Sequence, residues 1–245
     1  MKIADGLEVL EVKASVMGKQ SVVYPVLFHD DTDIVLVDTG FPGMLDELRE
    51  AVDNTGVPFS KLNKIIITHH DIDHMGCLSV TLKELPVDVE VLAHEGEKPY
   101  IQGDKTAVKL AKMEAILDSM PEQMKPMYEA FKAFFGSSTV KVDKVLADGE
   151  ELPFCGGITV ISTPGHTPGH ISLYHKQSKT LIAGDTLGVA DGQLIKTSPS
   201  INYDNELASA SLKKLAKLDI EVAVCYHGGL FRGDVSRRIA ELAAK

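Results

Sequence analysis

The sequence predicts an α/β fold built from two similar halves, with β-sheets inside and helices on the outside. In each half, two apolar runs joined by a polar turn predict a β-hairpin whose second strand ends in an aspartate. A helical stretch, another apolar strand and a histidine then follow in both halves. Because strands that are apolar almost throughout are typical of sheets covered on both faces, the helices are expected to lie outside them.

The first half runs from the hairpin at residues 22–40 to a histidine-rich loop. The hairpin ends at Asp38, the stretch 43–52 reads as a helix, and the strand K-I-I-I-T leads to His69. Since hairpin, helix and strand follow one another closely, Asp38 and His69 are expected to lie at neighbouring strand ends.

The second half repeats this order from the hairpin at residues 170–186. It ends at Asp185, and the stretch 204–218 has leucines at helical spacing with Asp204 as its expected N-cap. The strand E-V-A-V-C-Y then leads to His227. The repeat therefore predicts that each half presents an aspartate and a histidine on the same edge.

Between the halves, residues 97–136 predict a helical insertion with two helices, each opening near a threonine or a proline. Its methionines and aromatic residues form apolar stripes, which usually pack against the body of a protein. They can also form a lid over a substrate, because methionine adapts to varied shapes. For this second interpretation the candidate pocket residues are Met113, Met120, Met124 and Tyr128, with Tyr203 from the second half.

The composition predicts a soluble cytoplasmic protein that binds neither nucleic acid nor membranes. The formal net charge is −10 over 245 residues, and the chain has no run of Lys or Arg of the kind that follows a phosphate backbone. Its three cysteines are widely spaced, as expected in a reducing compartment. The first residues carry acids where a secretion signal needs an apolar stretch, and no apolar run approaches membrane-spanning length.

Ionisable side chains gather where the predicted strands end, and their types indicate a metal centre. Residues 68–74, T-H-H-D-I-D-H, hold three histidines and two aspartates. Residues 163–170, T-P-G-H-T-P-G-H, add two histidines among residues that predict tight turns. A lone histidine at a strand end is usually a hydrogen-bonded loop residue. Histidines and carboxylates at several strand ends instead provide nitrogen and oxygen ligands for a metal ion.

These motifs, in this order, resemble those of the metallo-β-lactamase superfamily. They are V-D-T-G with Asp38, T-H-x-x-x-D-H at 68–74, T-P-G-H-T at 163–167, G-D at 184–185 and H-G-G at 227–229. The resemblance spans nearly the whole chain. It implies a four-layer αβ/βα sandwich that forms a single domain over residues 1–245, with the metal site along one edge between the two sheets.

The resemblance also implies a centre for two divalent metal ions, with zinc as the first expectation. The implied ligands are, for the first ion, His69, Asp71 and His166, and for the second ion, Asp73, His74 and His227. Asp185 is expected to bridge the ions, and Asp73 and Asp185 to position a shared hydroxide. Asp38 is expected to orient ligand residues through hydrogen bonds, and His170 to stabilise its own turn.

Position 71 departs from the usual H-x-H-x-D-H pattern of the superfamily, because an aspartate stands where the second histidine is expected. Asp71 can replace that histidine as an oxygen ligand, which makes iron or manganese more favourable relative to zinc. His70 is a less favoured ligand, because neighbouring side chains in extended structure point in opposite directions. A third alternative is a weak or empty first site in a protein with one metal ion.

The resemblance implies hydrolysis of an ester, lactone, thioester or phosphodiester bond in a small substrate. The apolar insertion suggests that this substrate carries an acyl group. The motifs are most similar to those of acyl-homoserine lactonases and glyoxalase II-like thioesterases. Against the lactonases, Gly188 stands where they commonly place a tyrosine. The alternative is an iron-dependent redox enzyme, similar to the flavodiiron proteins but without room for their flavodoxin domain. The oligomeric state is open, and the Met and Phe stripe allows a homodimer.

Overall fold

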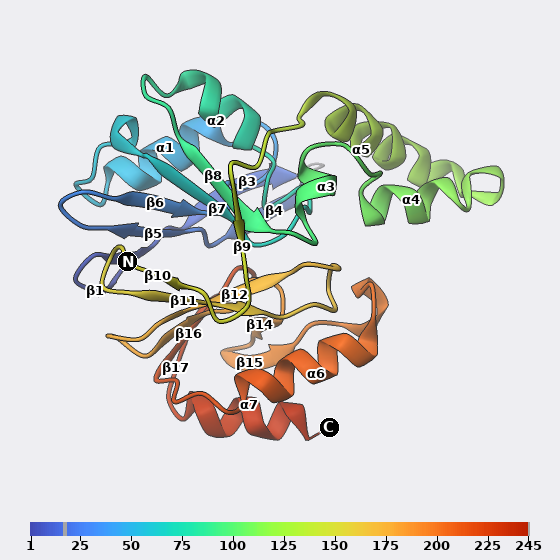
Figure 1. The fold of residues 1–245 in the computed structure, drawn as a ribbon. Helices are drawn as coiled ribbons and strands as arrows, with labels where there is room; N and C mark the ends of the chain where they lie inside the picture. The colour runs from blue at the N-terminus through green and yellow to red at the C-terminus, as the bar shows by residue number, and fades with distance from the viewer. Residues whose placement is uncertain (17–18, 245) are drawn as a thin grey trace.

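Two β-sheets face each other, and helices cover their outer faces (Figure 1). The computed structural model describes residues 1–16 and 19–244. The first sheet contains, in spatial order, β1 (Lys2–Ala4), β2 (Leu7–Val9), β5 (Val26–His29), β6 (Ile34–Val37), β7 (Lys64–Ile67), β8 (Glu90–His94) and β9 (Lys144–Leu146). Its strands from β6 to β9 are parallel, and its other pairs are antiparallel.

The second sheet is antiparallel except for one pair. It contains, in spatial order, β10 (Glu151–Leu152), β11 (Ile158–Ser162), β12 (Ile171–His175), β13 (Thr180–Ile182), β16 (Val222–Cys225) and β17 (Gly229–Arg232). The parallel pair is β13 with β16. Two short hairpins stand apart from these sheets: β3 (Val12–Val16) with β4 (Lys19–Val23), and β14 (Leu187–Ala190) with β15 (Gln193–Lys196). The sequence did not lead us to expect the pairing of β3 with β4 or the hairpin β14–β15.

Each sheet is covered by its own pair of helices. The first sheet carries α1 (Leu45–Asp53) and α2 (Leu78–Glu84), and the second carries α6 (Asn205–Leu215) and α7 (Val235–Ala243) (Figure 1). The side chain of Asp204 accepts hydrogen bonds from the backbone N–H groups of Glu206 and Leu207, which confirms it as the N-cap of α6. The four-layer αβ/βα sandwich predicted from the sequence is therefore confirmed.

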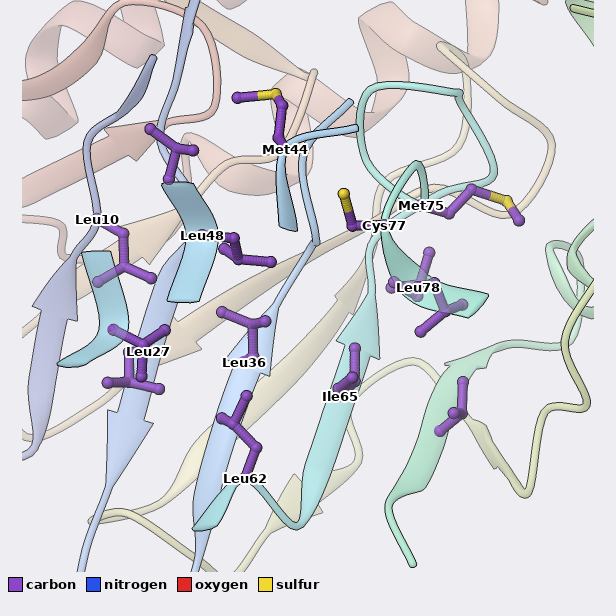
Figure 2. Packing of buried hydrophobic residues seen from close by; sticks show 14 of the residues in the cluster. Leu10, Leu27, Leu36, Met44, Leu48, Leu62, Ile65, Met75, Cys77 and Leu78 are labelled. Carbon is purple, nitrogen blue, oxygen red and sulfur yellow. The ribbon is translucent and has the colours of Figure 1, made fainter. Parts of the chain in front are cut away.

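Alternation along the central strands explains why they are apolar throughout. On β6, Val35 and Val37 point into the core between the two sheets, while Leu36 points into the core under α1 and α2. Figure 2 shows Leu36 in this outer core with Ile65 of β7, Leu48 of α1 and Leu78 of α2. Burying each such leucine or isoleucine stabilises the fold by about 1.5–3 kcal/mol. Because both faces are covered, a polar residue at any of these positions would be buried.

The insertion between the halves is helical, as predicted, but it contains three α-helices where two were expected. It contains α3 (Lys98–Ile101), α4 (Val108–Glu114) and α5 (Lys125–Ser137). Turns of 3₁₀-helix occupy 117–119 and 122–124 between α4 and α5, and a 3₁₀ turn also occurs at 59–61 and at 199–201. Phe134 of α5 joins the core over the first sheet, which attaches the insertion to the body. Within residues 1–16 and 19–244, no helix is both long enough and apolar enough to cross a membrane.

Candidate metal centre

The predicted ligands come together at one edge, at the carboxyl ends of the central strands. Asp38 follows β6 directly, and His69 comes two residues after the end of its parallel neighbour β7. In the second sheet, Asp185 and His227 follow the parallel pair β13 and β16. His166 comes from the loop between β11 and β12. Parallel strands end at the same edge of a sheet, so the repeated order of elements is what gathers these side chains.

Three residues form the first group that could hold a metal ion: His69, Asp71 and His166. All three are buried. Asp71 Oδ2 lies 2.8 Å from His166 Nε2 and 3.3 Å from His69 Nε2. One carboxylate oxygen thus faces two imidazole nitrogens, which is a donor set suited to a divalent ion.

A second group contains Asp73, His74 and His227, and a third contains His69, His74 and Asp185. His227 Nε2 lies 3.1 Å from Asp73 Oδ2, and its side chain is 46% exposed while the others are largely buried. This group therefore opens toward solvent on the side of His227.

Asp185 lies between the groups. Its Oδ1 is 3.3 Å from His74 Nε2, and its Oδ2 is 3.4 Å from His166 Nε2 and 3.5 Å from His227 Nε2. The carboxylate of Asp185 therefore lies near imidazole nitrogens from both halves of the chain, and it could bridge two metal ions.

Several buried nitrogen and oxygen atoms of the cluster do not satisfy one another by hydrogen bonds, which favours a bound cation. His69 Nε2, His74 Nε2 and Asp185 Oδ1 are buried and have no hydrogen-bond partner among the described residues. Buried polar atoms are nearly always paired, so these three atoms require a further partner. Burial lowers the pKa of His227, but the carboxylates of Asp185 and Asp73 outweigh this and raise it to about 10. The cluster therefore favours positive charge.

Asp38 is hydrogen-bonded to His74, one of the predicted ligands. Its Oδ2 lies 2.8 Å from Nδ1 of His74, which leaves Nε2 of that ring facing the cluster. Its two oxygens also accept hydrogen bonds from the backbone N–H and the hydroxyl of Thr68. Asp38 itself has a φ of 61°, a left-handed conformation that is uncommon outside glycine. The strained turn brings its carboxylate back over the loop.

His170 lies behind the cluster and stabilises its own turn. Nε2 accepts a hydrogen bond from the backbone N–H of Asp185 at 2.9 Å, and Nδ1 lies 2.8 Å from Oγ1 of Thr163. Burial lowers the pKa of His170 to about 3. The neutral ring can therefore accept the hydrogen bond that holds the backbone of Asp185 in place.

His70 does not point toward the cluster, so the alternative in which it replaces Asp71 as ligand is wrong in this structure. Its Nδ1 is paired with the carboxylate of Glu97, and its ring stacks on Tyr100 with centroids 4.3 Å apart. Its Nε2 accepts a hydrogen bond from the backbone N–H of Val108 at 3.2 Å. The physical reason is the alternation considered above: consecutive side chains leave the extended chain on opposite sides.

Glu97 joins the two histidine-rich loops, a role that no motif in the sequence indicated. It is fully buried, and one oxygen accepts hydrogen bonds from the hydroxyl of Thr167 and the N–H of Gly169, both at 2.7 Å. The other oxygen accepts from the N–H of His70 at 2.8 Å. A Cβ at Gly169 would lie 2.6 Å from the backbone of Gly96, so glycine is required for this approach. Only the glycine-rich character of T-P-G-H-T-P-G-H could have indicated a close contact.

Tyr226 is a second residue that the sequence did not single out. Its hydroxyl donates to the carbonyl of Asp73 at 2.6 Å and accepts from the N–H of Gly40 at 3.1 Å. Its ring lies over His74, with centroids 3.8 Å apart. Burial raises the pKa of Tyr226 well above its ordinary value, and Asp38 and Asp73 raise it further. The neutral hydroxyl thus ties the first half of the chain to the end of β16.

Lys109 is the third residue that sequence reasoning missed. It belongs to α4, and its Nζ lies 2.5 Å from Asp71 Oδ2. Burial lowers the pKa of Lys109, but the carboxylate of Asp71 outweighs this and raises it above its ordinary value. No spacing in the sequence connects position 109 with position 71. Their contact depends on how the insertion packs.

A cavity of about 270 Å³ adjoins the cluster. His166 and Asp185 line it on one side, and Thr197, Asn202 and Asn205 are among the residues that line it on the other. The predicted pocket residues of the insertion lie elsewhere. Met120 and Tyr128 are buried in a small core of the insertion itself, against which Met113 and Met124 pack. Tyr203 is 51% exposed, and its backbone N–H donates to the carbonyl of His166.

Comparison with known proteins decides the family. The model of the metallo-beta-lactamase superfamily matches residues 18–227. The chain belongs to the metallo-beta-lactamase superfamily. It is 30% identical over 223 residues to the probable metallo-hydrolase YflN of Bacillus subtilis, an alignment that covers 85% of this chain and 80% of the relative.

Two further similar proteins show how widely the likeness extends. A crystal structure of a metallo-beta-lactamase family protein from Thermus thermophilus is 26% identical with a TM-score of 0.75, covering 99% of this chain and 80% of that one. A hydroxyacylglutathione hydrolase from Brucella ovis is 27% identical over 207 residues, which cover 83% of this chain and 61% of that relative. The shared fold explains why the predicted ligands meet at the sheet edge.

Proposed function

We propose that this superfamily member is a metal-dependent hydrolase that holds two divalent metal ions and cleaves an ester, lactone, thioester or phosphodiester bond of a small substrate. The observation that carries the proposal is the set of three overlapping groups of histidine and aspartate, joined through His69, His74 and Asp185. Three of their buried donor atoms have no hydrogen-bond partner among the described residues. Such atoms are expected where a cation completes the site.

The ligand assignment follows the predicted division. His69, Asp71 and His166 would hold the first ion, Asp73, His74 and His227 the second, with Asp185 between them. Zinc is the metal that these imidazoles favour most, while the added carboxylate of Asp71 also suits iron or manganese. Divalent ions at such a centre supply a water of lowered pKa and a Lewis acid for the electrophilic oxygen.

The residues of the chain would orient the attacking water and limit the side from which the substrate enters. The carboxylates of Asp73 and Asp185 face the space between the groups and can position the attacking water by accepting its hydrogen bonds. His170, which accepts from the backbone N–H of Asp185, would keep that carboxylate aligned. Burial of His69 and His74 on the inner side limits access, so the substrate would enter on the side of His227, whose side chain is 46% exposed.

The cavity beside His166 and Asp185 suggests what the substrate carries. Its lining combines polar residues such as Lys196 and Asn202 with apolar residues such as Leu212, so we propose that a substrate group with both polar and apolar parts occupies it. The similarity to hydroxyacylglutathione hydrolases of Brucella favours a thioester among the candidate bonds. The earlier expectation of an acyl chain in a Met-rich pocket is less favoured, because Met120 and Tyr128 pack within the insertion.

The test combines metal analysis with a substrate panel. Protein purified from medium supplemented with zinc, iron and manganese would be analysed for bound metal and assayed on lactones, thioesters and bis-aryl phosphates. Asp185→Asn removes the charge of the proposed bridging ligand, so it should weaken metal binding by more than the roughly tenfold to hundredfold typical of residues that only support a ligand, and it should abolish hydrolysis. Asp191→Asn makes the same change at an exposed turn and should behave like the wild type.

Two outcomes would contradict the proposal. A protein that binds none of the three metals is not a metal-dependent hydrolase. Bound iron with oxygen uptake and no hydrolysis would support the alternative, an iron-dependent redox enzyme. The hard oxygen ligand Asp71 is the observation that favours this alternative, because carboxylate oxygen suits iron and manganese better than a second imidazole would.

A further inference from the structure

Lys109 places a positive charge against the residue at which this chain departs from the superfamily motif. Its Nζ is 2.5 Å from Oδ2 of Asp71, the same oxygen that faces His166 and His69. The contact therefore involves the atom that would bind the first metal ion. The second group of ligands, around Asp73 and His227, has no lysine or arginine in ion-pair contact among the described residues.

The helix α4 of the insertion holds Lys109 beside Asp71. The helix α4 begins at Val108, whose N–H donates to Nε2 of His70. On either side of Lys109 along the chain, Ala107 and Leu110 are buried in the core of the insertion. The backbone of Lys109 is thus held on both sides, while 34% of its side chain remains exposed. A flexible lysine stem can move its ammonium group into water without disturbing the helix.

The positive charge of Lys109 compensates the buried negative charge of Asp71. The carboxylate of Asp71 is 2% exposed, and a buried carboxylate without a compensating charge is strongly unfavourable. The ammonium of Lys109 supplies this compensating charge to Asp71 before any metal ion binds. A metal ion that binds through Asp71 would have to displace the ammonium or bind beside it, whereas the group of Asp73, His74 and His227 has no lysine or arginine to displace among the described residues.

We propose that Lys109 acts as an internal cation that competes with the first metal ion for Asp71, so that the centre binds one ion tightly and the other more weakly. The inference rests on the proposed metal centre and deepens it. Lys109 is thus a positioning residue that sets the occupancy of the first site. Its release on binding would couple the insertion to the filling of that site, since the same helix carries the lysine and is anchored to His70.

Zinc titration of the metal-free protein tests the proposal. For the wild type we expect two unequal binding steps by calorimetry, and Asp71→Ala should remove the weaker step only. Lys109→Met keeps the apolar stem and removes the charge, so it should tighten the weaker step by about tenfold to hundredfold, the factor that corresponds to one charge-assisted hydrogen bond to Asp71. Lys109→Arg keeps the charge and should titrate like the wild type.

Lys112→Met is the matched control. It removes a lysine from the same helix, one whose Nζ donates to the carbonyl of Asn202 instead of an aspartate, and it should leave both steps unchanged. Two equal steps in the wild type, or a weaker step that Lys109→Met leaves unchanged or weakens, would overturn the inference while leaving the metal centre intact. A wild type that binds no zinc, iron or manganese would instead overturn the proposed function.

Discussion

The buried carboxylate of Glu97 offers the sharpest test of how the centre is held together. It accepts hydrogen bonds from Thr167 and Gly169 on one oxygen and from the backbone and ring of His70 on the other. Glu97→Gln keeps the shape of the side chain but replaces one acceptor oxygen with a donor amide. The substitution therefore separates hydrogen bonding from packing.

The hydrogen bonds of Glu97 determine how much unfolding free energy the substitution should remove. If the retained oxygen serves Thr167 and Gly169, the new amide faces two donors of His70. The ring can exchange its tautomer and accept on Nδ1, but its Nε2 then carries a proton toward the N–H of Val108, which now donates to it at 3.2 Å. The backbone N–H of His70 stays unpaired in either case. An unpaired buried donor costs about 1–3 kcal/mol, so the total loss of unfolding free energy should be about 2–4 kcal/mol.

Urea unfolding followed by circular dichroism measures this loss. The experiment is done with a chelator present, because a bound metal would add its own stabilisation. Glu95→Gln is the control: it makes the same change two residues earlier at an exposed position and should stay within about 0.5 kcal/mol of the wild type. Glu97→Gln behaving like this control would refute the reasoning.

The effect should also depend on pH. Burial raises the pKa of Glu97, but His70, Thr167 and Gly169 outweigh it and lower the pKa below its ordinary value. A carboxylate with a lowered native pKa contributes stability above its unfolded pKa and loses it as the pH falls through the native pKa. The difference between wild type and Glu97→Gln should therefore be full at pH 7 and shrink in acid.

Two further predictions concern contacts elsewhere in the fold. Tyr226→Phe keeps the ring over His74 but leaves the carbonyl of Asp73 and the N–H of Gly40 without their partner; we expect a loss of about 1–3 kcal/mol in urea unfolding, and an unchanged value would contradict it. Asp30→Asn removes the carboxylate oxygen that accepts from the N–H of Cys155 at 2.6 Å, for an expected loss of about 1 kcal/mol at pH 7 after allowing for its exposure. Because backbone hydrogen bonds lower the pKa of Asp30 although burial opposes them, this loss should shrink as the pH falls from 4 toward 2, and a difference independent of pH would count against the assignment.

Local patterns were enough to predict the elements that carry the ligands. The repeated order of hairpin, aspartate, helix, strand and histidine depends on turn residues and apolar periodicity within short stretches, and both are visible in the sequence. The N-cap at Asp204 is likewise a local signal, and the structure places it at the start of α6. The hairpin β14–β15 was missed, because its strands are short and only partly buried and so show little apolar alternation.

The position of the insertion, and therefore the shape of the site, was beyond local reasoning. The sequence allowed a Met-rich pocket or a packed core at residues 97–136, and the structure buries Met120 and Tyr128 together. The choice depends on which apolar surfaces meet, since equivalent stripes can face a substrate or one another. The cavity beside His166 instead comes from loops of the second half.

The sequence by itself determined which side chains are the predicted ligands and the strand ends at which they stand, because each belongs to a short motif. Only the tertiary structure decided what surrounds them. Glu97 meets Gly169 across 72 positions, Tyr226 meets Asp73 across 153, and Lys109 meets Asp71 across the start of the insertion. Such contacts produce no periodic pattern in the sequence, because ion pairs and hydrogen bonds depend on distance in space and not on spacing along the chain.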